Sequence, residues 1–463
     1  MYIQQIYTNC LAQAAYYIES GKEAAIIDPL RNPEPYIAIA KERGATIKYV
    51  LETHFHADFV SGHIDLANKT GASIVFGPGA TPGYRAYIAE DHETLHLGDA
   101  KIEILHTPGH TVESTCYLLR DQHGKESAVF TGDTLFVGDV GRPDLLSGNL
   151  SKEELASMLF DSLQNQIKTL PADVVVYPGH GAGSACGKNI SSKSTSTIGD
   201  ECITNYALLA NDKQAFISVV TSELPYIPGY FFKDAAINKS GYGSYDDIIR
   251  KNVNALSCRE FAAVKNTGVQ ILDTRDPMTF SRGFIPGALN IGLSGDFAVW
   301  VGTLISADTQ LLLVTEHGKE LEAVERLARI GFEQVKGYLQ GGMASWVAAN
   351  LETDTIQTVS AAMCGDIIES GEYELLDVRN RREVAKHRVP GAVHIPLNNL
   401  KELYSTLAAD KKWLVYCAGG YRSMIAASFL KANGFTDTGS IEGGINEIIK
   451  HNPEMVELAL ETD

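Results

Sequence analysis

Short apolar runs alternate with amphipathic stretches along the first half of the chain. Residues 14–18 and 23–27 predict two paired strands, because both are rich in strand-forming side chains and a polar turn separates them. Residues 33–43 have the spacing of a helix, and residues 48–51 predict a buried strand. This alternation of strands and helices favours an α/β fold.

The same alternation continues toward residue 200. Residues 151–154 have the sequence of a capping box, which predicts a helix through about residue 167. Residues 174–177 predict another strand. The polar stretch 184–200 has no apolar period, so we expect a long loop or lid there.

The second half of the chain contains an internal repeat. Residues 273–276 recur 104 positions later as residues 377–380, and residues 285–288 recur at the same offset as residues 389–392. Each copy predicts the order strand–helix–strand–helix and therefore an α/β domain. A chain of 463 residues should hold several domains. The predicted domains are residues 1–242, 243–354 and 355–463.

Composition narrows the range of partners. The formal net charge of −18 argues against nucleic acid and anionic membranes. No apolar run reaches the ~20 residues that cross a bilayer, and the N-terminus lacks a basic region followed by an apolar stretch. The seven cysteines are scattered, so we expect free thiols in a cytoplasmic protein rather than disulfides. A homo-oligomer is compatible with the sequence.

Metal-binding side chains follow four of the predicted strands. Loops at the ends of strands converge on one edge of a sheet, where functional side chains gather. One histidine alone would be an ordinary polar side chain, but the joint placement of histidines and aspartates predicts a metal site. The residues are His54, His56, Asp58, His110, Asp133 and His180.

A cysteine loop follows the predicted strand 413–416. Residues 417–423, Cys-Ala-Gly-Gly-Tyr-Arg-Ser, have the sequence of a turn that leads into a helix. Backbone N–H groups and a helix N-terminus favour a thiolate and a bound anion, and two glycines allow a tight curl. We therefore predict that Cys417 is catalytic and that Arg422 braces an oxyanion. The predicted substrate-binding residues of this loop are Gly419, Gly420, Tyr421, Arg422 and Ser423.

Five blocks between residue 1 and about residue 240 occur in an order that resembles the persulfide dioxygenases of the metallo-β-lactamase superfamily. The Cys417 loop resembles the active loop of rhodaneses, and phosphatases of similar build carry one more residue between cysteine and arginine. The resemblance implies a metallo-β-lactamase αββα sandwich followed by two rhodanese-like α/β domains. The five blocks are residues 54–58 (His-x-His-x-Asp), 108–111, 131–136, 141–144 and 177–180.

The resemblance implies that His54, His110 and Asp133 bind one Fe(II) per chain. Two imidazoles and one carboxylate leave coordination positions for a thiolate and O2. The implied reaction converts a low-molecular-weight persulfide, O2 and water into sulfite and the thiol, with glutathione, coenzyme A or another thiol as carrier. The residues that would orient ligands or water are His56, Asp58 and His180.

Phe59 is the main departure from the two-metal hydrolases of this superfamily, which have a histidine in its place. A phenyl ring has no lone pair, so the sequence disfavours a two-zinc hydrolytic site. His56 could instead turn in as a third nitrogen and favour zinc. The alternative function is a zinc-dependent thioesterase of the glyoxalase II kind fused to rhodanese domains. A redox-sensing or scaffold protein is a further alternative, against which the intact metal set and Cys417 argue.

Three residues outside the predicted metal site and the Cys417 loop each allow two interpretations. Arg142 is either an anchor for a substrate carboxylate or part of a structural ion pair. Cys186 and Cys202 lie in or beside the polar loop, as bystanders or as a sulfur relay toward the metal.

The first repeat lacks the cysteine of the second. Glu316 is assigned to the position of Cys417, and a carboxylate carries no sulfur and repels thiosulfate. We expect this domain to fold as a rhodanese without catalysing. The resemblance implies that Cys417 carries a persulfide between a thiosulfate or thiol donor and an acceptor, so that thiosulfate is either made or consumed.

Overall fold

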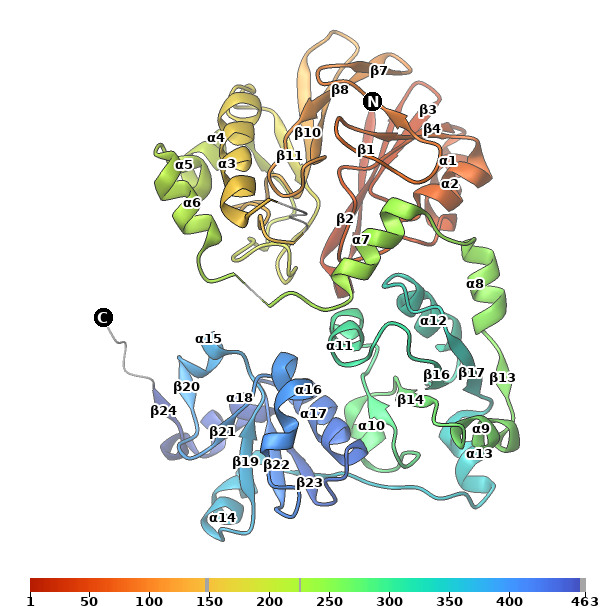
Figure 1. The fold of residues 1–463 in the computed structure, drawn as a ribbon, viewed down its shortest axis with the longest axis vertical. Coiled ribbons are helices and arrows are strands. Elements are labelled where there is room, and N and C mark those ends of the chain that lie inside the picture. The colour runs from red at the N-terminus through yellow and green to blue at the C-terminus, as the bar shows by residue number, and fades with distance from the viewer. Residues whose placement is uncertain (146–149, 225, 459–463) are drawn as a thin grey trace. The chain divides into compact units, whose positions relative to one another are not determined.

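The computed structural model describes residues 1–145, 150–224 and 226–458, and the chain forms two compact units (Figure 1). The first unit holds Met1–Ile248 together with Ala328–Gly331, and the second holds the remainder of the chain. The predicted boundary at residues 242 and 243 lies near this division. The predicted boundary at residues 354 and 355 lies within the second unit and stays a prediction.

Two six-stranded sheets face each other in the first unit, with an apolar core between them that includes Tyr16, Leu51, Tyr117 and Phe130. In spatial order the first sheet contains β1 (Tyr2–Thr8), β2 (Gln13–Ser20), β3 (Glu23–Ile27), β4 (Thr46–Leu51), β5 (Ser73–Phe76) and β6 (Tyr87–Ile88). The second contains β12 (Ser196–Thr197), β11 (Val175–Pro178), β10 (Glu126–Gly132), β9 (Thr115–Arg120), β8 (Ala100–His106) and β7 (Thr94–Leu97).

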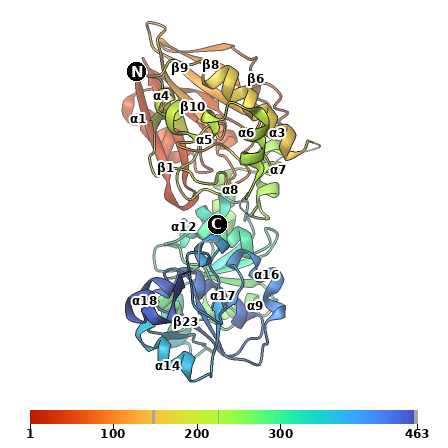
Figure 2. The same cartoon turned by 90° about the vertical axis from the view of Figure 1, so that its left-hand side faces the viewer.

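Helices cover the outer faces of both sheets. The helices α1 (Glu34–Arg43) and α2 (His63–Thr70) pack on the first sheet. The second sheet is covered by α3 (Lys152–Ser162), α4 (Ile198–Thr204), α5 (Tyr206–Leu209) and α6 (Lys213–Thr221), which Figure 2 shows from that side. The predicted αββα sandwich is therefore confirmed. The unit continues with α7 (Phe231–Ser240) and the first residues of α8 (Tyr245–Asn252), which runs into the second unit.

The helices and strands predicted for the first unit agree with the structure, except in the polar stretch 184–200. The strand pair β2–β3 is antiparallel, and the side chain of Ser151 caps α3 in a capping box with Glu154. The stretch 184–200 is not a loop throughout. Its end forms β12, which pairs with β11, and the start of α4, because the Thr197 side chain accepts the Asp200 N–H and caps that helix.

The second unit contains two five-stranded parallel sheets with the same connectivity, which confirms the internal repeat. The first sheet has the order β13 (Ala255–Leu256), β17 (Val335–Leu339), β16 (Leu311–Val314), β14 (Gln270–Asp273) and β15 (Leu289–Asn290). The other has the order β18 (Gln357–Val359), β23 (Thr438–Ile441), β22 (Trp413–Tyr416), β19 (Glu374–Asp377) and β21 (Val393–His394). A short antiparallel pair joins β20 (His387–Arg388) to β24 (Glu457–Leu458).

Helices flank both sheets of the second unit. Those of the first repeat are α9 (Cys258–Lys265), α10 (Pro277–Ser281), α11 (Phe297–Leu304), α12 (Glu320–Ala328) and α13 (Gly342–Ala348). Those of the second repeat are α14 (Cys364–Glu369), α15 (Arg381–Val384), α16 (Leu400–Leu403), α17 (Tyr421–Ala432) and α18 (Gly444–His451).

The repeated Asp-x-Arg sequence forms the same buried ion pair in both repeats. Arg275 contacts Asp273 at 2.6 Å, and Arg379 contacts Asp377 at 2.6 Å. Each guanidinium also donates to a backbone carbonyl eight residues ahead of it, so the pair fixes the chain that follows its strand. The motif therefore has a structural role in each repeat.

All seven cysteines are free. Among the described residues, no helix is both long and apolar enough to cross a bilayer.

Candidate metal centre and cysteine loop

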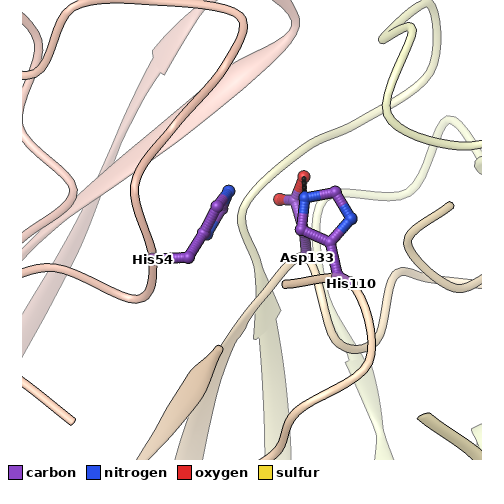
Figure 3. Close-up of side chains that lie close together, drawn as sticks. All are labelled: His54, His110 and Asp133. Atoms are coloured by element: carbon purple, nitrogen blue, oxygen red, sulfur yellow. Dashed lines mark ion pairs between the residues drawn. The ribbon is translucent and has the colours of Figure 1, made fainter. Parts of the chain in front are cut away.

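The three predicted iron ligands lie on loops that leave strands of both sheets of the first unit. His54 follows β4, His110 follows β8, and Asp133 follows β10 directly. Their ligand atoms all lie within 4.8 Å of one another, and all three side chains are buried. Figure 3 shows the three side chains turned toward one another.

The backbone fixes the orientation of the His110 ring. His110 Nδ1 lies 2.8 Å from the Arg142 carbonyl oxygen, which can only accept a hydrogen bond. Nδ1 must therefore carry the proton, so the lone pair is on Nε2, which lies 3.4 Å from Asp133 Oδ2. Both carboxylate oxygens of Asp133 are buried without a hydrogen-bond partner. Unpartnered buried oxygens facing an imidazole lone pair suit a bound cation.

Two successive hydrogen bonds, through Thr53 to Asp28, fix the ring of His54. Asp28 Oδ2 accepts a hydrogen bond of 2.8 Å from the Thr53 hydroxyl, and Thr53 Oγ lies 2.9 Å from His54 Nδ1. Because the hydroxyl proton is used on Asp28, Thr53 Oγ accepts from Nδ1 and leaves the lone pair on His54 Nε2. Sequence reasoning missed Asp28. Its left-handed backbone, with φ of 49° directly after β3, marks it in the structure.

His56 is turned away from these three ligands. Its Nε2 lies 3.1 Å from Asp28 Oδ1 and 3.7 Å from Glu52 Oε2, and its ring stacks on Phe59 at 4.3 Å between centroids. Burial alone would lower the pKa of His56, but the carboxylates of Asp28 and Glu52 raise it to about 9. A protonated imidazole has no lone pair for a metal. The possibility that His56 turns in as a third nitrogen is thus not the arrangement found.

Asn238 on α7 holds the loop that carries His56 and Phe59. Its side-chain N–H donates to the carbonyl oxygens of His56 at 2.8 Å and Phe59 at 2.7 Å, and its Oδ1 accepts from the Ser61 N–H. Nothing in the local sequence pointed to this residue, which lies about 180 positions farther along the chain. The loop conformation depends on this long-range contact.

A second group of donors lies on the other side of Asp133. Asp58, His180 and Cys186 offer ligand atoms within 4.8 Å of one another, and all three are buried. Burial and the nearby carboxylates of Asp58 and Asp133 raise the pKa of the Cys186 thiol well above its usual range. Cys202 is not in this group.

Arg142 is buried and paired. Its Nε and Nη2 contact the two carboxylate oxygens of Asp144 at 2.7 and 2.8 Å, and Nη1 donates to the Ala185 carbonyl. This geometry favours the structural ion pair over a substrate anchor. The pairing of the Arg142 side chain also fixes the position of the Arg142 backbone carbonyl, which orients His110.

The Cys417 loop is built from backbone donors at the end of β22. Cys417 is buried, and its Sγ accepts the Gly420 N–H at 3.1 Å and lies 3.7 Å from Ser423 Oγ. Gly420 has φ of 99°, which lets the loop turn its N–H toward the sulfur before α17 begins at Tyr421. The predicted turn into a helix is therefore present.

Two further residues of the loop have partners outside it. Arg422 contacts Glu383 through two N–O pairs at 2.6 and 2.8 Å. The Tyr421 hydroxyl donates to the Gly292 carbonyl of the first repeat at 2.7 Å. A cavity of about 360 Å³ beside the loop is lined by Gly419, Gly420, Tyr421, Asp276, Met278 and Ser294, among others.

In the first repeat, the residue that corresponds to Cys417 is one position earlier than the sequence assignment gave. Asp273 pairs with Val314, and Asp377 pairs with Tyr416, so the residue after each strand is Thr315 in one repeat and Cys417 in the other. The register thus places Thr315, rather than Glu316, opposite Cys417, because β16 and β22 are 102 residues apart, whereas the assignment of Glu316 implies an offset of 101. Glu316 is the next residue and is exposed. A threonine hydroxyl carries no sulfur either.

Family models match both halves of the chain. Residues 8–180 match the model of the metallo-beta-lactamase superfamily. Residues 258–349 and 360–451 each match the model of the rhodanese-like domain.

Several individual proteins are also similar. A probable hydroxyacylglutathione hydrolase of Schizosaccharomyces pombe, glo2, is 36% identical over 35% of this chain and 60% of its own length. The hydroxyacylglutathione hydrolase of Pelagibacter ubique is 31% identical over 37% of this chain and 68% of its own length. The chain spans about three fifths of the first of these relatives. The crystal structure of a metallo-beta-lactamase from Staphylococcus aureus is 34% identical, covers 73% of this chain and 98% of its own, and superposes with a TM-score of 0.65.

Proposed function

The chain belongs to the metallo-beta-lactamase superfamily and carries two rhodanese-like domains, and from this we propose that it is a bifunctional sulfur-metabolising enzyme. The first unit oxidises the persulfide of a small thiol with O2 at one Fe(II), giving sulfite and the thiol. The Cys417 loop transfers a sulfane sulfur through a cysteine persulfide.

The observation that carries the proposal is the donor set His54, His110 and Asp133. Two imidazoles and one carboxylate are the ligands typical of non-haem Fe(II) oxygenases, which keep open positions for substrate and O2. A third nitrogen, from His56, would favour a closed tetrahedral zinc site, but that ring is held by Asp28 and Glu52.

The residues of the chain have separate tasks in this reaction. The Thr53 hydroxyl and the Arg142 carbonyl hold the His54 and His110 rings with Nε2 toward the site. Iron bound there would activate dioxygen and polarise the persulfide sulfur. The burial of all three ligands limits access of bulk water to the reactive sulfur. The atoms balance as RSSH + O2 + H2O giving RSH and sulfurous acid, which ionises to sulfite.

The Cys417 loop performs a displacement on sulfur. In the thiosulfate-consuming direction, the Cys417 thiolate attacks the sulfane sulfur, the S–S bond to sulfite breaks, and sulfite leaves with the electron pair. The Gly420 N–H and the N-terminus of α17 stabilise the anionic sulfur. Sulfite is the product of the first reaction and the acceptor in the reverse of the second, so the two activities can be coupled in one chain with thiosulfate as product.

A zinc-dependent hydrolase of acyl thioesters is the second candidate for the first unit. The names of the curated relatives favour it, since they are hydroxyacylglutathione hydrolases. That reaction consumes water but no O2, so the two candidates differ in a directly measurable way.

Oxygen uptake on protein of known metal content tests the proposal. We expect protein reconstituted with Fe(II) to consume O2 and release sulfite when glutathione persulfide is added, with less than a tenth of that rate for zinc-loaded protein. Glutathione and coenzyme A persulfides should be compared to identify the carrier thiol. Hydrolysis of an acyl-glutathione thioester by zinc-loaded protein, with no O2 uptake in the iron form, would overturn the proposal.

A further inference from the structure

A cavity in the first repeat lies where the central strands of that repeat end. β14 is followed by β15 on one side of it in the sheet, and β16 is followed by β17 on the other side. The crevice beyond the carboxyl ends of two such strands is where open α/β sheets bind ligands. A cavity of about 340 Å³ at these strand ends is lined by Thr274, Ser294, Glu316, Lys319 and Arg326, among others. The repeat that lacks the cysteine thus keeps a pocket large enough for a small molecule.

Two cations of this cavity share one carboxylate. Lys319 Nζ lies 2.8 Å from Glu322 Oε2, and Arg326 Nη2 lies 2.5 Å from Glu322 Oε1. Arg326 Nη1 donates to the Leu293 carbonyl at 2.6 Å, which fixes the guanidinium at the cavity. One positive charge is therefore left over, and it can bind the carboxylate of a ligand.

The same cavity has two carboxylates without a cation. Asp276 Oδ1 accepts the backbone N–H groups of Met278 and Thr279 and so caps α10. Among the residues that the structure describes, no cation pairs with Asp276 or Glu316, and both side chains are exposed. Free carboxylates attract an ammonium group and repel an additional anion.

The lining therefore favours a ligand that carries both an ammonium and a carboxylate. An amino-acid end has this pair of charges. A tail that carries several phosphates would meet Asp276 and Glu316 without a compensating cation, so the same lining disfavours a polyanion.

This cavity adjoins the cavity beside the Cys417 loop. Asp276 and Ser294 line both of them. Gly420, whose N–H faces Cys417 Sγ, lines the second cavity. One bound molecule can therefore extend from the charged pocket of the first repeat toward the reactive sulfur of the second.

Direct contacts hold the two repeats together at this place. The Tyr421 hydroxyl donates to the Gly292 carbonyl, and a Cβ on Gly295 would lie 2.4 Å from a Tyr421 ring carbon. The Asn290 N–H donates to Ser428 Oγ at 3.0 Å. Both repeats belong to one compact unit. The loop after β15 is thus packed against the Cys417 loop, and the two cavities keep their relative position.

We propose that the first repeat binds the amino-acid end of the small thiol that exchanges sulfur with Cys417, and that glutathione is a thiol of this kind. Lys319 and Arg326 face the carboxylate of that end, and Glu316 and Asp276 face its ammonium. The inference rests on the proposed sulfur transfer and adds the chemical class of the thiol. It also gives the repeat without a cysteine a binding role.

The transfer itself is a displacement on sulfur. The thiolate of the bound thiol attacks the outer sulfur of the Cys417 persulfide, and the S–S bond to Cys417 breaks. Cys417 leaves as a thiolate with the electron pair, and the small thiol leaves as its persulfide. No external oxidant or reductant is needed, because the sulfane sulfur only changes its partner.

The choice of acceptor tests the pocket. At saturating thiosulfate, kcat/KM for an acceptor reports its attack on the Cys417 persulfide. It is measured on full-length protein for glutathione, for N-acetylglutathione, which lacks the ammonium, for coenzyme A, which carries phosphates, and for cyanide. We expect kcat/KM for glutathione to exceed that for N-acetylglutathione and coenzyme A by about fivefold or more.

Variants of the first repeat sharpen this test. Glu316→Gln and Lys319→Gln should each lower the ratio of kcat/KM for glutathione to that for cyanide by roughly three- to tenfold. Cyanide is too small to reach from one cavity to the other, so it is the internal reference. The matched controls Glu320→Gln on α12 and Lys336→Gln on β17 lie outside the cavity lining and should keep the wild-type ratio.

Equilibrium dialysis gives a readout without catalysis. S-Methylglutathione keeps the charged groups of glutathione but cannot accept sulfur. In full-length protein, Glu316→Gln should weaken the binding of one equivalent of it by roughly three- to tenfold.

Two results would overturn the inference. One is a wild-type ratio in both Glu316→Gln and Lys319→Gln, and the other is wild-type protein that uses coenzyme A or N-acetylglutathione as well as glutathione. Absence of sulfur transfer to cyanide would instead refute the proposed activity of Cys417, and the dialysis would still decide whether the pocket binds the thiol.

Discussion

The metal centre and the Cys417 loop assemble their chemistry in opposite ways. The proposed metal ligands come from loops spread over residues 54–133, and the two imidazole rings are oriented by Asp28, Thr53 and Arg142. The Cys417 loop is seven consecutive residues whose own backbone N–H faces the sulfur. The first centre depends on distant contacts, and the second is largely local. Substitutions should therefore affect one centre and spare the other.

Loss of a metal ligand should have the largest effect. We expect His110→Ala to abolish persulfide-dependent O2 uptake, because only two protein ligands would remain for the proposed iron. Sulfur transfer from thiosulfate to cyanide should stay within about twofold of wild type. Oxygen-electrode and thiocyanate assays measure the two activities on the same preparation. His106→Ala is a matched control, since His106 lies nearby on β8 but outside the donor set. Loss of both activities in His110→Ala would mean that the centres are not separable.

Substitution of Cys417 tests the other centre, the Cys417 loop. Cys417→Ser should abolish thiosulfate sulfur transfer, because serine forms no persulfide, and leave O2 uptake with a supplied persulfide intact. Cys258→Ser, at a cysteine outside the active loop in the first repeat, should change neither activity. Sulfur transfer that persists in Cys417→Ser would favour the scaffold interpretation of the second unit.

Removal of the His54 relay should have an intermediate effect. Thr53→Val keeps the side-chain size but removes the oxygen that holds His54 Nδ1. We expect iron affinity to fall about 10- to 100-fold, as for other groups that orient metal ligands. Competition with a chelator measures this, and sulfur transfer serves as the internal control. Unchanged iron affinity would show that packing alone orients the ring.

The same contrast explains what the sequence could predict. His54, His110 and Asp133 lie within a few residues of the ends of short strands, so their convergence could be inferred from strand ends. The Cys417 loop could be predicted because its chemistry lies within seven residues. The direction of the His56 ring could not, since Asp28 and Glu52 decide it.

Two other features were also beyond local reasoning. The position of Cys186 depends on where a loop without apolar period returns to Asp58 and His180. The one-residue shift from Glu316 to Thr315 depends on the register of β14 against β16, which the repeat offset of the loops does not reveal. In each case, contacts between distant segments determine the outcome.

The smallest effect concerns the ion pair between Arg422 of the Cys417 loop and Glu383 outside it. Glu383 neutralises Arg422, and although burial acts to raise the pKa of Glu383, the Arg422 hydrogen bond lowers it below the usual 4.5. The pair is therefore intact above pH 4.5, and its contribution to stability is lost as the pH falls through the lowered pKa. Glu383→Gln keeps a side chain that can serve the capping box of α15 but frees the guanidinium.

In the Glu383→Gln variant, thiosulfate, the anionic sulfur donor, should bind more tightly than in the wild type. Competition from a partly exposed carboxylate is worth about 0.4–1 kcal/mol, so KM for thiosulfate should fall roughly two- to fivefold at neutral pH with kcat nearly unchanged. Steady-state kinetics at fixed cyanide measures both. Asn380→Asp, at the N-cap of the same helix, is the control for helix stability, because aspartate is an equally good cap. A KM that rises instead would mean that Glu383 holds Arg422 in its binding position, and the loop would then depend on an outside contact as the metal centre does.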